Sequence, residues 1–184
     1  MKEKKQYIFS DQMSLYGESE CLGFGSESFY IKEIDRKWAN KIIIKNHYSK
    51  KVYNATYIHL GLFENDKLVG VLQYGYAMNP ASCGSVVEGT KQNEYLELNR
   101  MWLSDDIQIK YPESQAISMS ISYIKKKYKT IKWIQSFADE RCGGFGIVYQ
   151  ACSFNYYGEH TSSFWELDGE TFHNSIMTSE KAGP

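Results

Sequence analysis

The chain has 184 residues, a net charge of −1 at pH 7 and a 15% share of aromatic side chains, with fifteen tyrosines. Its length suits one domain with its own hydrophobic core, and its near-neutral charge excludes a globally basic nucleic-acid binder. It has no apolar run of the ~18 residues that cross a bilayer, no signal-peptide pattern in residues 1–10, and four cysteines without a CxxC pair. We therefore expect a cytoplasmic protein with reduced thiols, no membrane contact and no structural zinc cluster.

Residues 1–28 are polar and end in a glycine- and serine-rich stretch, so we expect an N-terminal arm or extension. A first strand is predicted over residues 29–34, and Asp35 is a suitable N-cap for a helix that should end near Asn46. The loop after this helix begins with three chemically functional side chains, His47, Tyr48 and Ser49. A histidine in such a loop is more often a surface residue than a ligand, so both interpretations stay open.

A hairpin comes next, and its two strands are predicted over residues 56–63 and 67–76. A further strand over residues 94–103 carries Arg100 among apolar neighbours, and an isolated buried charge is unfavourable. The partner of this guanidinium is either a carboxylate of the protein, Glu97 or Asp139, or an anionic ligand. That ligand could be a phosphate or the carboxylate of an acyl donor.

A second helix is predicted to begin at Pro112, and hydroxyl side chains recur along it every four residues. These are Ser114, Ser118 and Ser122. Hydroxyls and free N–H groups at a helix N-terminus make a natural anion site, while an ordinary cap at Ser114 is the competing interpretation.

The helix ends in three lysines, Lys125, Lys126 and Lys127. A second basic group consists of Lys41, Lys45, Lys50 and Lys51. Such groups are usually solvated faces, but they can engage phosphates.

Residues 131–138 alternate apolar and polar side chains and predict a strand, and residues 145–152 show helical spacing. Asp139 therefore lies where a strand ends and a helix is about to begin, which is where open α/β sheets bind ligands. The glycines between them either admit a ligand close to the backbone or only make a tight turn. Two final strands are predicted over residues 154–159 and 163–168, followed by a tail over residues 169–184.

This order of elements predicts a mixed α/β fold in which helices flank a central twisted sheet. Because no repeat or linker divides them, residues 29–168 are interpreted as a single catalytic domain. The succession resembles the acyltransferase fold of the GNAT superfamily, whose sheet is splayed to admit an acyl-CoA. Residues 111–118 stand where that superfamily has a glycine-rich pyrophosphate loop, but they lack its glycines, so ordinary CoA binding is not implied there.

Five motifs occur in order over about residues 40–160. They are His47-Tyr48-Ser49, Leu98-Asn99-Arg100-Met101-Trp102, the helix start at residues 114–118, Ser136-Phe137-Ala138-Asp139 and Gly146-Ile147-Val148-Tyr149-Gln150-Ala151. Together they resemble the Mom DNA-modification proteins of bacteriophages, a GNAT-like family. That family converts adenine in phage DNA to an N6-carbamoylmethyl form, which shields the DNA from host restriction endonucleases. Family members often carry a histidine where this chain has Gly144, so the role of that histidine is not transferred.

The resemblance implies roles for several side chains. The implied catalytic residues are His47, Tyr48, Asp139 and Tyr149, and the implied cofactor-binding residues are Arg100, Ser114 and Ser118. Iron, as Fe²⁺, is the implied metal, because the imidazole, carboxylate and phenolate of His47, Asp139 and Tyr149 can ligate it. The same three groups could instead act as general base, orienting carboxylate and general acid. The carbon donor is acetyl-CoA or another activated two-carbon compound.

The implied partner is double-stranded DNA with the target adenine flipped out of the stack, where tyrosines such as Tyr48 could stack on it. The implied phosphate contacts are Lys50, Lys51, Lys125, Lys126 and Lys127. Because the adenine amine is a weak nucleophile, activation by a metal or by the donor is expected. Two alternatives stay open: a GNAT N-acetyltransferase that uses acetyl-CoA on a protein or small-molecule amine, and an idle module that binds DNA or protein. The oligomeric state also stays open, with a homodimer as one option.

Overall fold

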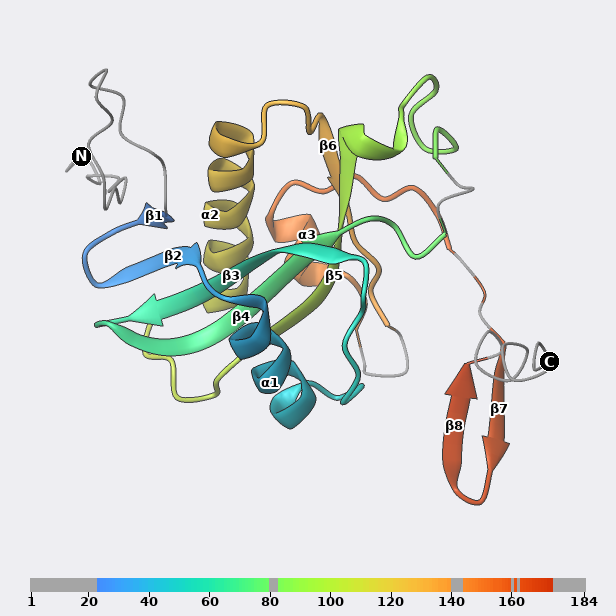
Figure 1. Ribbon diagram of the computed structural model, residues 1–184, viewed down its shortest axis with the longest axis horizontal. Helices are drawn as coiled ribbons and strands as arrows, with labels where there is room; N and C mark the ends of the chain where they lie inside the picture. Colours follow the sequence, from blue (N-terminus) through green and yellow to red (C-terminus); the bar gives the residue numbers. More distant parts are fainter. Residues whose placement is uncertain (1–22, 80–82, 140–143, 160, 162, 174–184) are drawn as a thin grey trace. The chain divides into compact units, whose positions relative to one another are not determined.

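The computed structural model describes residues 23–79, 83–139, 144–159, 161 and 163–173 (Figure 1). The chain forms two compact units, Met1–Phe154 and Asn155–Pro184. The second unit contains an antiparallel pair of strands, β7 (Phe164–Leu167) and β8 (Glu170–His173). Within the described ranges, no helix is both long and apolar enough to cross a membrane.

The first unit is built on a six-stranded sheet whose strands lie in the same order as in the chain. They are β1 (Gly23–Gly25), β2 (Phe29–Glu33), β3 (Thr56–Glu64), β4 (Lys67–Gly75), β5 (Tyr95–Leu103) and β6 (Trp133–Gln135). Neighbours from β1 to β5 pair antiparallel, whereas β6 runs parallel to β5. The helices are α1 (Arg36–Asn46), the 3-10 helix η2 (Gln92–Glu94), α2 (Pro112–Lys127) and α3 (Ile147–Ala151). This is the mixed α/β arrangement that the sequence predicts.

Local side-chain chemistry explains where α1 and the β3–β4 hairpin begin and end. The Asp35 carboxylate accepts a hydrogen bond from the Lys37 amide at 2.7 Å, which caps the first turn of α1 as predicted. Asn65 and Asp66 both have positive φ values, 48° and 63°, as the two-residue turn of a hairpin requires. The predicted first helix and hairpin are therefore confirmed.

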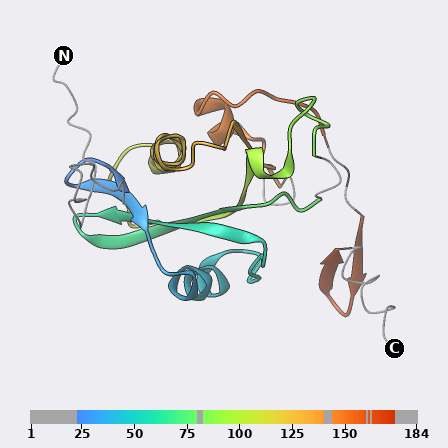
Figure 2. The same ribbon diagram turned by 45° about the horizontal axis from the view of Figure 1, so that its top comes forward.

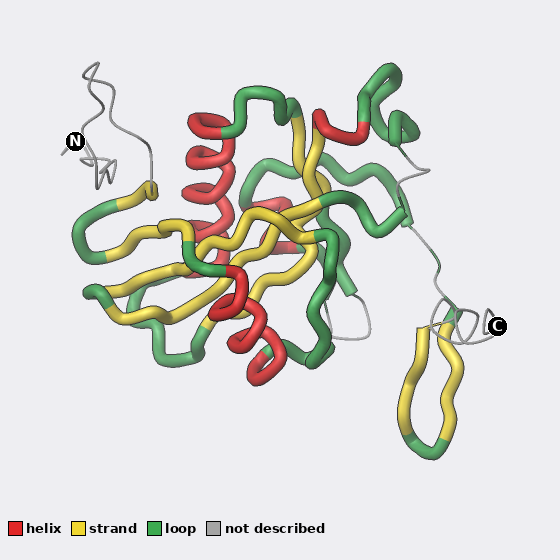
Figure 3. Tube along the Cα trace, viewed as in Figure 1, coloured by secondary structure: helices red, strands yellow, loops and turns green. Residues whose placement is uncertain are grey.

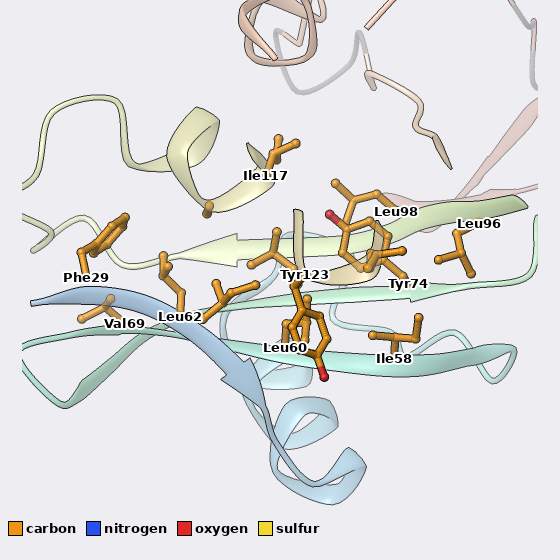
Figure 4. Close-up of a cluster of buried hydrophobic side chains, with 14 residues drawn as sticks. Phe29, Ile58, Leu60, Leu62, Val69, Tyr74, Leu96, Leu98, Ile117 and Tyr123 are labelled. Atoms are coloured by element: carbon orange, nitrogen blue, oxygen red, sulfur yellow. The ribbon is translucent and has the colours of Figure 1, made fainter. Parts of the chain in front are cut away.

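Helices cover both faces of the sheet (Figure 2). On one face α1 contributes Ala39 and Ile43 to a small apolar cluster with Val71. On the other face α2 contributes Ala116, Ile117, Tyr123 and Ile124 to the main core, which it forms with side chains from β2 to β5 (Figure 4). The main core thus lies between the sheet and α2, with α3 packed at its margin.

The sheet opens between β5 and β6. Only three residue pairs join the two strands, and the last of them is Glu97 with Gln135. Beyond that pair β5 continues to Leu103, while the chain after β6 leaves the sheet. A bulge lies just past this point, because Gln73 pairs with Arg100 and Tyr74 with Leu98, leaving Asn99 as the extra residue of β5. Bulges re-aim side chains and often lie beside active sites.

Most predicted elements form, but several differ in extent (Figure 3). The strand predicted over residues 131–138 is the shorter β6, and the helix predicted over residues 145–152 is the shorter α3. The strand predicted over residues 154–159 is wrong, because the Phe154 amide donates to the Tyr149 carbonyl at 3.0 Å and the chain turns back onto α3. The strand predicted over residues 163–168 is confirmed as β7. Two unpredicted strands, β1 and β8, lie in the stretches assigned to the extension and the tail.

Candidate active site

Polar side chains from three separate segments meet where β5 and β6 part. His47 and Tyr48 follow the end of α1, Glu97 and Arg100 lie on β5, and Asp139 follows β6. The Tyr48 hydroxyl donates to the Asp139 carboxylate at 3.4 Å, which joins residues 91 positions apart in the chain. The structure therefore brings together four of the predicted site residues: His47, Tyr48, Arg100 and Asp139.

His47 is a buried, neutral histidine. Its side chain is only 6% exposed, and its Nδ1 atom accepts a hydrogen bond from the Ser49 amide at 3.1 Å. This bond assigns the ring proton to Nε2. Burial and the nearby Arg100 cation lower the pKa of His47 to about 4. The ring lies against the Tyr48 ring, with 4.3 Å between centroids. His47 therefore serves better as an N–H donor and as a support for Tyr48 than as a base at neutral pH.

The lowered pKa of His47 predicts a pH dependence of stability. Between its ordinary value of 6.5 and about 4, the unfolded chain binds a proton here and the folded chain does not. The free energy of unfolding should therefore fall as the pH falls through this window, by on the order of 3 kcal/mol in all. Denaturant unfolding measures the free energy of unfolding at pH 7 and again near pH 4. The difference between the two values should be smaller for His47→Gln than for the unaltered protein. An equal difference in both proteins would contradict the assignment.

Arg100 is a half-buried cation that forms no ion pair with the described residues. Its Nε atom donates to the Lys51 carbonyl at 3.1 Å and its Nη1 atom to the Asn99 carbonyl at 2.6 Å. No carboxylate in the described part of the chain lies within ion-pair distance of it. Burial lowers the pKa of Arg100. Of the partners that the sequence left open, neither protein carboxylate is bonded to this guanidinium, although the charge of Glu97 acts to raise its pKa. An anionic ligand would add the charge-assisted hydrogen bonds that are absent among the described residues.

Glu97 is a site residue that the sequence considered only as a partner for Arg100. It is 3% exposed, and its Oε1 atom accepts from Asn99 Nδ2 at 3.0 Å. Its Oε2 atom accepts from Gln135 Nε2 at 2.9 Å and from the Met78 amide at 3.3 Å. The Glu97–Gln135 side-chain bond therefore joins the last residue pair of the β5–β6 ladder. We interpret Glu97 as a positioning residue that sets where the two strands part.

Exchange of the two side chains tests this role of Glu97. Glu97→Gln should lower the free energy of unfolding by about 1–3 kcal/mol. Both carboxylate oxygens of Glu97 accept hydrogen bonds, and an amide would put an NH2 group in place of one of them. Adding Gln135→Glu restores an amide–carboxylate pair and should recover part of both stability and activity. Denaturant unfolding measures the stability of the three variants, and the turnover and Michaelis constants measure their activity. If the losses in the double variant equal the sum of the losses in the two single variants, the two side chains are not directly coupled.

The remaining predicted residues lie on α2 and α3, on the opposite side of the sheet from α1. Tyr149 packs against Phe154 with 5.5 Å between ring centroids, and burial raises the pKa of its phenol. The Ser114 hydroxyl donates to the Tyr111 carbonyl at 3.1 Å in the first turn of α2, and Ser118 is exposed. In the described part of the structure, no hydrogen bond links these three side chains to Arg100 or His47.

The predicted iron ligands can be compared with this arrangement. Across the ranges that the structure describes, no three His, Cys, Asp or Glu side chains are arranged to hold a metal ion. His47 already uses Nδ1, so only Nε2 could bind a metal. Burial raises the pKa of the Tyr149 phenol. Because the predicted ligand set includes this tyrosine, it is not one of those three-residue groups, and iron stays a prediction.

The predicted DNA-binding lysines fall into two places. Lys50 and Lys51 adjoin the site, since the Lys51 carbonyl binds Arg100. Lys125, Lys126 and Lys127 lie at the end of α2, on the other face of the sheet (Figure 2). Within that second group, Lys127 forms an ion pair with Glu33 at 2.9 Å. The structure thus does not bring the two groups together on one surface.

Two solved structures resemble the fold. A possible acetyltransferase from Clostridium difficile 630 matches with a TM-score of 0.50 and 14% identity, covering 77% of this chain and 99% of that one. An integron cassette protein from the mobile metagenome of V. cholerae matches with a TM-score of 0.53 and 11% identity, covering 85% and 99%. At these identities the likeness concerns the fold alone, and it confirms the predicted acyltransferase-like architecture.

The sequence comparisons are more specific. A model of the Mom protein family matches residues 28–184. A protein of Escherichia phage Mu, methylcarbamoylase mom, is 46% identical over 182 residues, which make up 99% of this chain and 75% of that protein.

Proposed function

Because this chain belongs to the Mom protein family, we propose that it is a DNA-modifying transferase that attaches a carbamoylmethyl group to N6 of adenine. The observation that carries the proposal is the 46% identity, over 99% of this chain, to a phage protein named as a methylcarbamoylase. The modified base would protect phage DNA from host restriction endonucleases. The proposed place of action is the cytoplasm of the host cell.

We assign proton transfer to Asp139 and orientation of the base to Tyr48. Tyr48 is 60% exposed, and its 3.4 Å bond to Asp139 is long enough to yield to an incoming amine. As N6 forms a bond to the methylene carbon of a donor of the type X–CH2–C(O)NH2, the bond between that carbon and X breaks and X leaves with its electron pair. One N6 proton passes to the Asp139 carboxylate. His47 holds the Tyr48 ring from the protein side.

Arg100 is the proposed binding residue for the anionic part of the donor. The guanidinium is held by two backbone carbonyls and forms no ion pair with a carboxylate among the described residues, although the nearby charge of Glu97 acts to raise its pKa. Charge-assisted hydrogen bonds to a carboxylate or phosphate would compensate its desolvation. The donor is therefore expected to be an anion, and it must carry its leaving group on the methylene carbon of an intact carbamoylmethyl unit. Acetyl-CoA, whose leaving group is on the acyl carbon, would instead give the amide of the N-acetyltransferase alternative.

Iron stays a prediction from the family resemblance. Elemental analysis of the purified protein tests it, with the Asp139→Asn variant as a comparison. Iron that is bound in equimolar amount and lost in that variant would support the predicted ligand set. Iron that is retained in the variant would place any metal elsewhere in the chain.

The proposed function is tested by nucleoside mass spectrometry on DNA from cells that express this chain. We expect an adenosine whose mass is increased by a carbamoylmethyl group, and none in cells with an empty vector. The modification requires access to a base that is normally stacked, so we also expect faster reaction at adenines opposite a mismatch. Unmodified DNA from well-expressed, folded protein would contradict the proposal, and acetylated protein in the same cells would favour the N-acetyltransferase alternative.

A further inference from the structure

The outward face of α1 is strongly basic. Between Asp35 and Lys51 the chain has six basic side chains and one acidic side chain, although its overall net charge is −1. The Asp35 carboxylate is already bonded to the Lys37 amide as the helix cap. The basic side chains are all exposed: Arg36, Lys37, Lys41, Lys45, Lys50 and Lys51. This concentration of positive charge suits a polyanion.

The lysines of α1 form a row of suitable length. Lys37, Lys41 and Lys45 recur at intervals of four residues, so they lie along one side of the helix over about 12 Å. Over that distance one strand of a DNA duplex presents about three or four phosphates. The opposite side of α1 is occupied by Ala39 and Ile43, which anchor the helix to the sheet. The row is therefore presented on a fixed support.

An aromatic side chain lies within this basic face. Trp38 is 62% exposed, and the Lys41 ammonium lies 5.5 Å from the centroid of its ring. The Trp38 ring thus leaves a large apolar area in water in the middle of the lysines. Lysine next to an aromatic ring is a combination that contacts both phosphates and the sugar–base surface.

The basic face leads directly into the site. The helix ends at Asn46, and the next two residues are His47 and Tyr48 of the candidate active site. The α2 lysines lie on the other face of the sheet, and one of them is paired with Glu33. A duplex that follows α1 would therefore reach Tyr48 and Asp139, whereas one that follows the end of α2 would approach from the far side (Figure 2).

We propose that the outward face of α1, with Trp38 and the lysine row, is the surface on which double-stranded DNA docks. This inference rests on the proposed function, because it assigns the binding surface of the same substrate. The docking is independent of sequence, since lysines on phosphates carry no base information.

The test measures affinity for a fluorescein-labelled duplex by anisotropy, at salt concentrations from about 50 to 200 mM. The α1 variant carries Lys37→Gln, Lys41→Gln and Lys45→Gln. A matched control removes the same charge at scattered exposed positions, with Lys67→Gln, Lys110→Gln and Lys129→Gln. A third protein carries Lys125→Gln and Lys126→Gln. The α1 variant should bind about tenfold or more weakly at low salt, and its slope of log affinity against log salt should fall by about two to three.

Trp38 gives an independent reading. The tryptophan fluorescence of the unaltered protein should change when the unlabelled duplex is added, and this change should be largely lost in Trp38→Ala. The same variant should bind more weakly without a change in the salt slope. If the α1 variant binds like the scattered control, or if only the Lys125/Lys126 variant loses affinity, the inference is overturned. That result leaves the proposed function intact as long as adenosine modification persists in cells. Absence of modification by the unaltered chain would instead contradict the function itself.

Discussion

Asp139→Asn should reduce the modified adenosine in DNA by about 10²–10⁴-fold, the usual contribution of a positioned general base. The amide keeps the shape of the side chain and an oxygen that can accept from Tyr48, but it cannot take up the N6 proton. Tyr48→Phe removes only the hydroxyl from the same pair and leaves the ring against His47, so its effect should be smaller. Nucleoside mass spectrometry on DNA from expressing cells measures both variants.

The two variants separate chemistry from folding. Asp139 lies in a partly exposed segment after β6, so Asp139→Asn should leave the melting temperature close to that of the unaltered protein. Retention of more than about a tenth of the modified adenosine by a well-folded Asp139→Asn protein would exclude this carboxylate as the base. A larger loss from Tyr48→Phe than from Asp139→Asn would move the proton transfer to the phenol.

Arg100→Met should abolish most of the modification while leaving the protein folded. An arginine that binds an anion through charge-assisted bonds contributes about 1.5–3 kcal/mol, so about ten- to hundredfold weaker donor use is expected. Stability should change little, because the two lost bonds to the Lys51 and Asn99 carbonyls are offset by the removal of a half-buried charge that has no ion pair among the described residues.

Arg100→Lys provides the matched control, since it keeps the charge but not the planar fork of donors. We expect activity between that of Arg100→Met and the unaltered protein, recovered in part at high donor concentration. Modification assays at several donor concentrations and thermal unfolding measure the two properties separately. A strongly destabilised Arg100→Met protein would instead assign Arg100 a structural role in fixing the loop at Lys51.

Local signals explain which parts of the fold can be predicted from the sequence. The Asp35 cap and the Asn65–Asp66 turn are determined by residues within four positions of each other, and both are confirmed. The strand predicted over residues 154–159 failed because Phe154 returns onto α3, which is a packing effect that these residues alone do not encode. The ends of β6 depend on pairing with β5, a strand about thirty residues earlier, and no local pattern encodes them.

The same distinction applies to the site. Motif resemblance identified Tyr48, Arg100 and Asp139 as candidates, but their proximity depends on contacts across 91 residues of chain. Glu97 carries no such signal, because an acidic residue in a strand looks like any other until its donors are known. Its position in the last pair of the ladder is visible only in the fold.

The single parallel pairing of the sheet also has a consequence for how the chain folds. The β1–β2 and β3–β4 hairpins close short loops, whereas β6 can join β5 only after the crossover through α2 has formed. Its three residue pairs lie at one edge of the sheet, where local opening requires little free energy. The active site thus depends on a pairing of only three residue pairs that requires the crossover. Partial unfolding can therefore abolish catalysis while the antiparallel strands and their core remain in place.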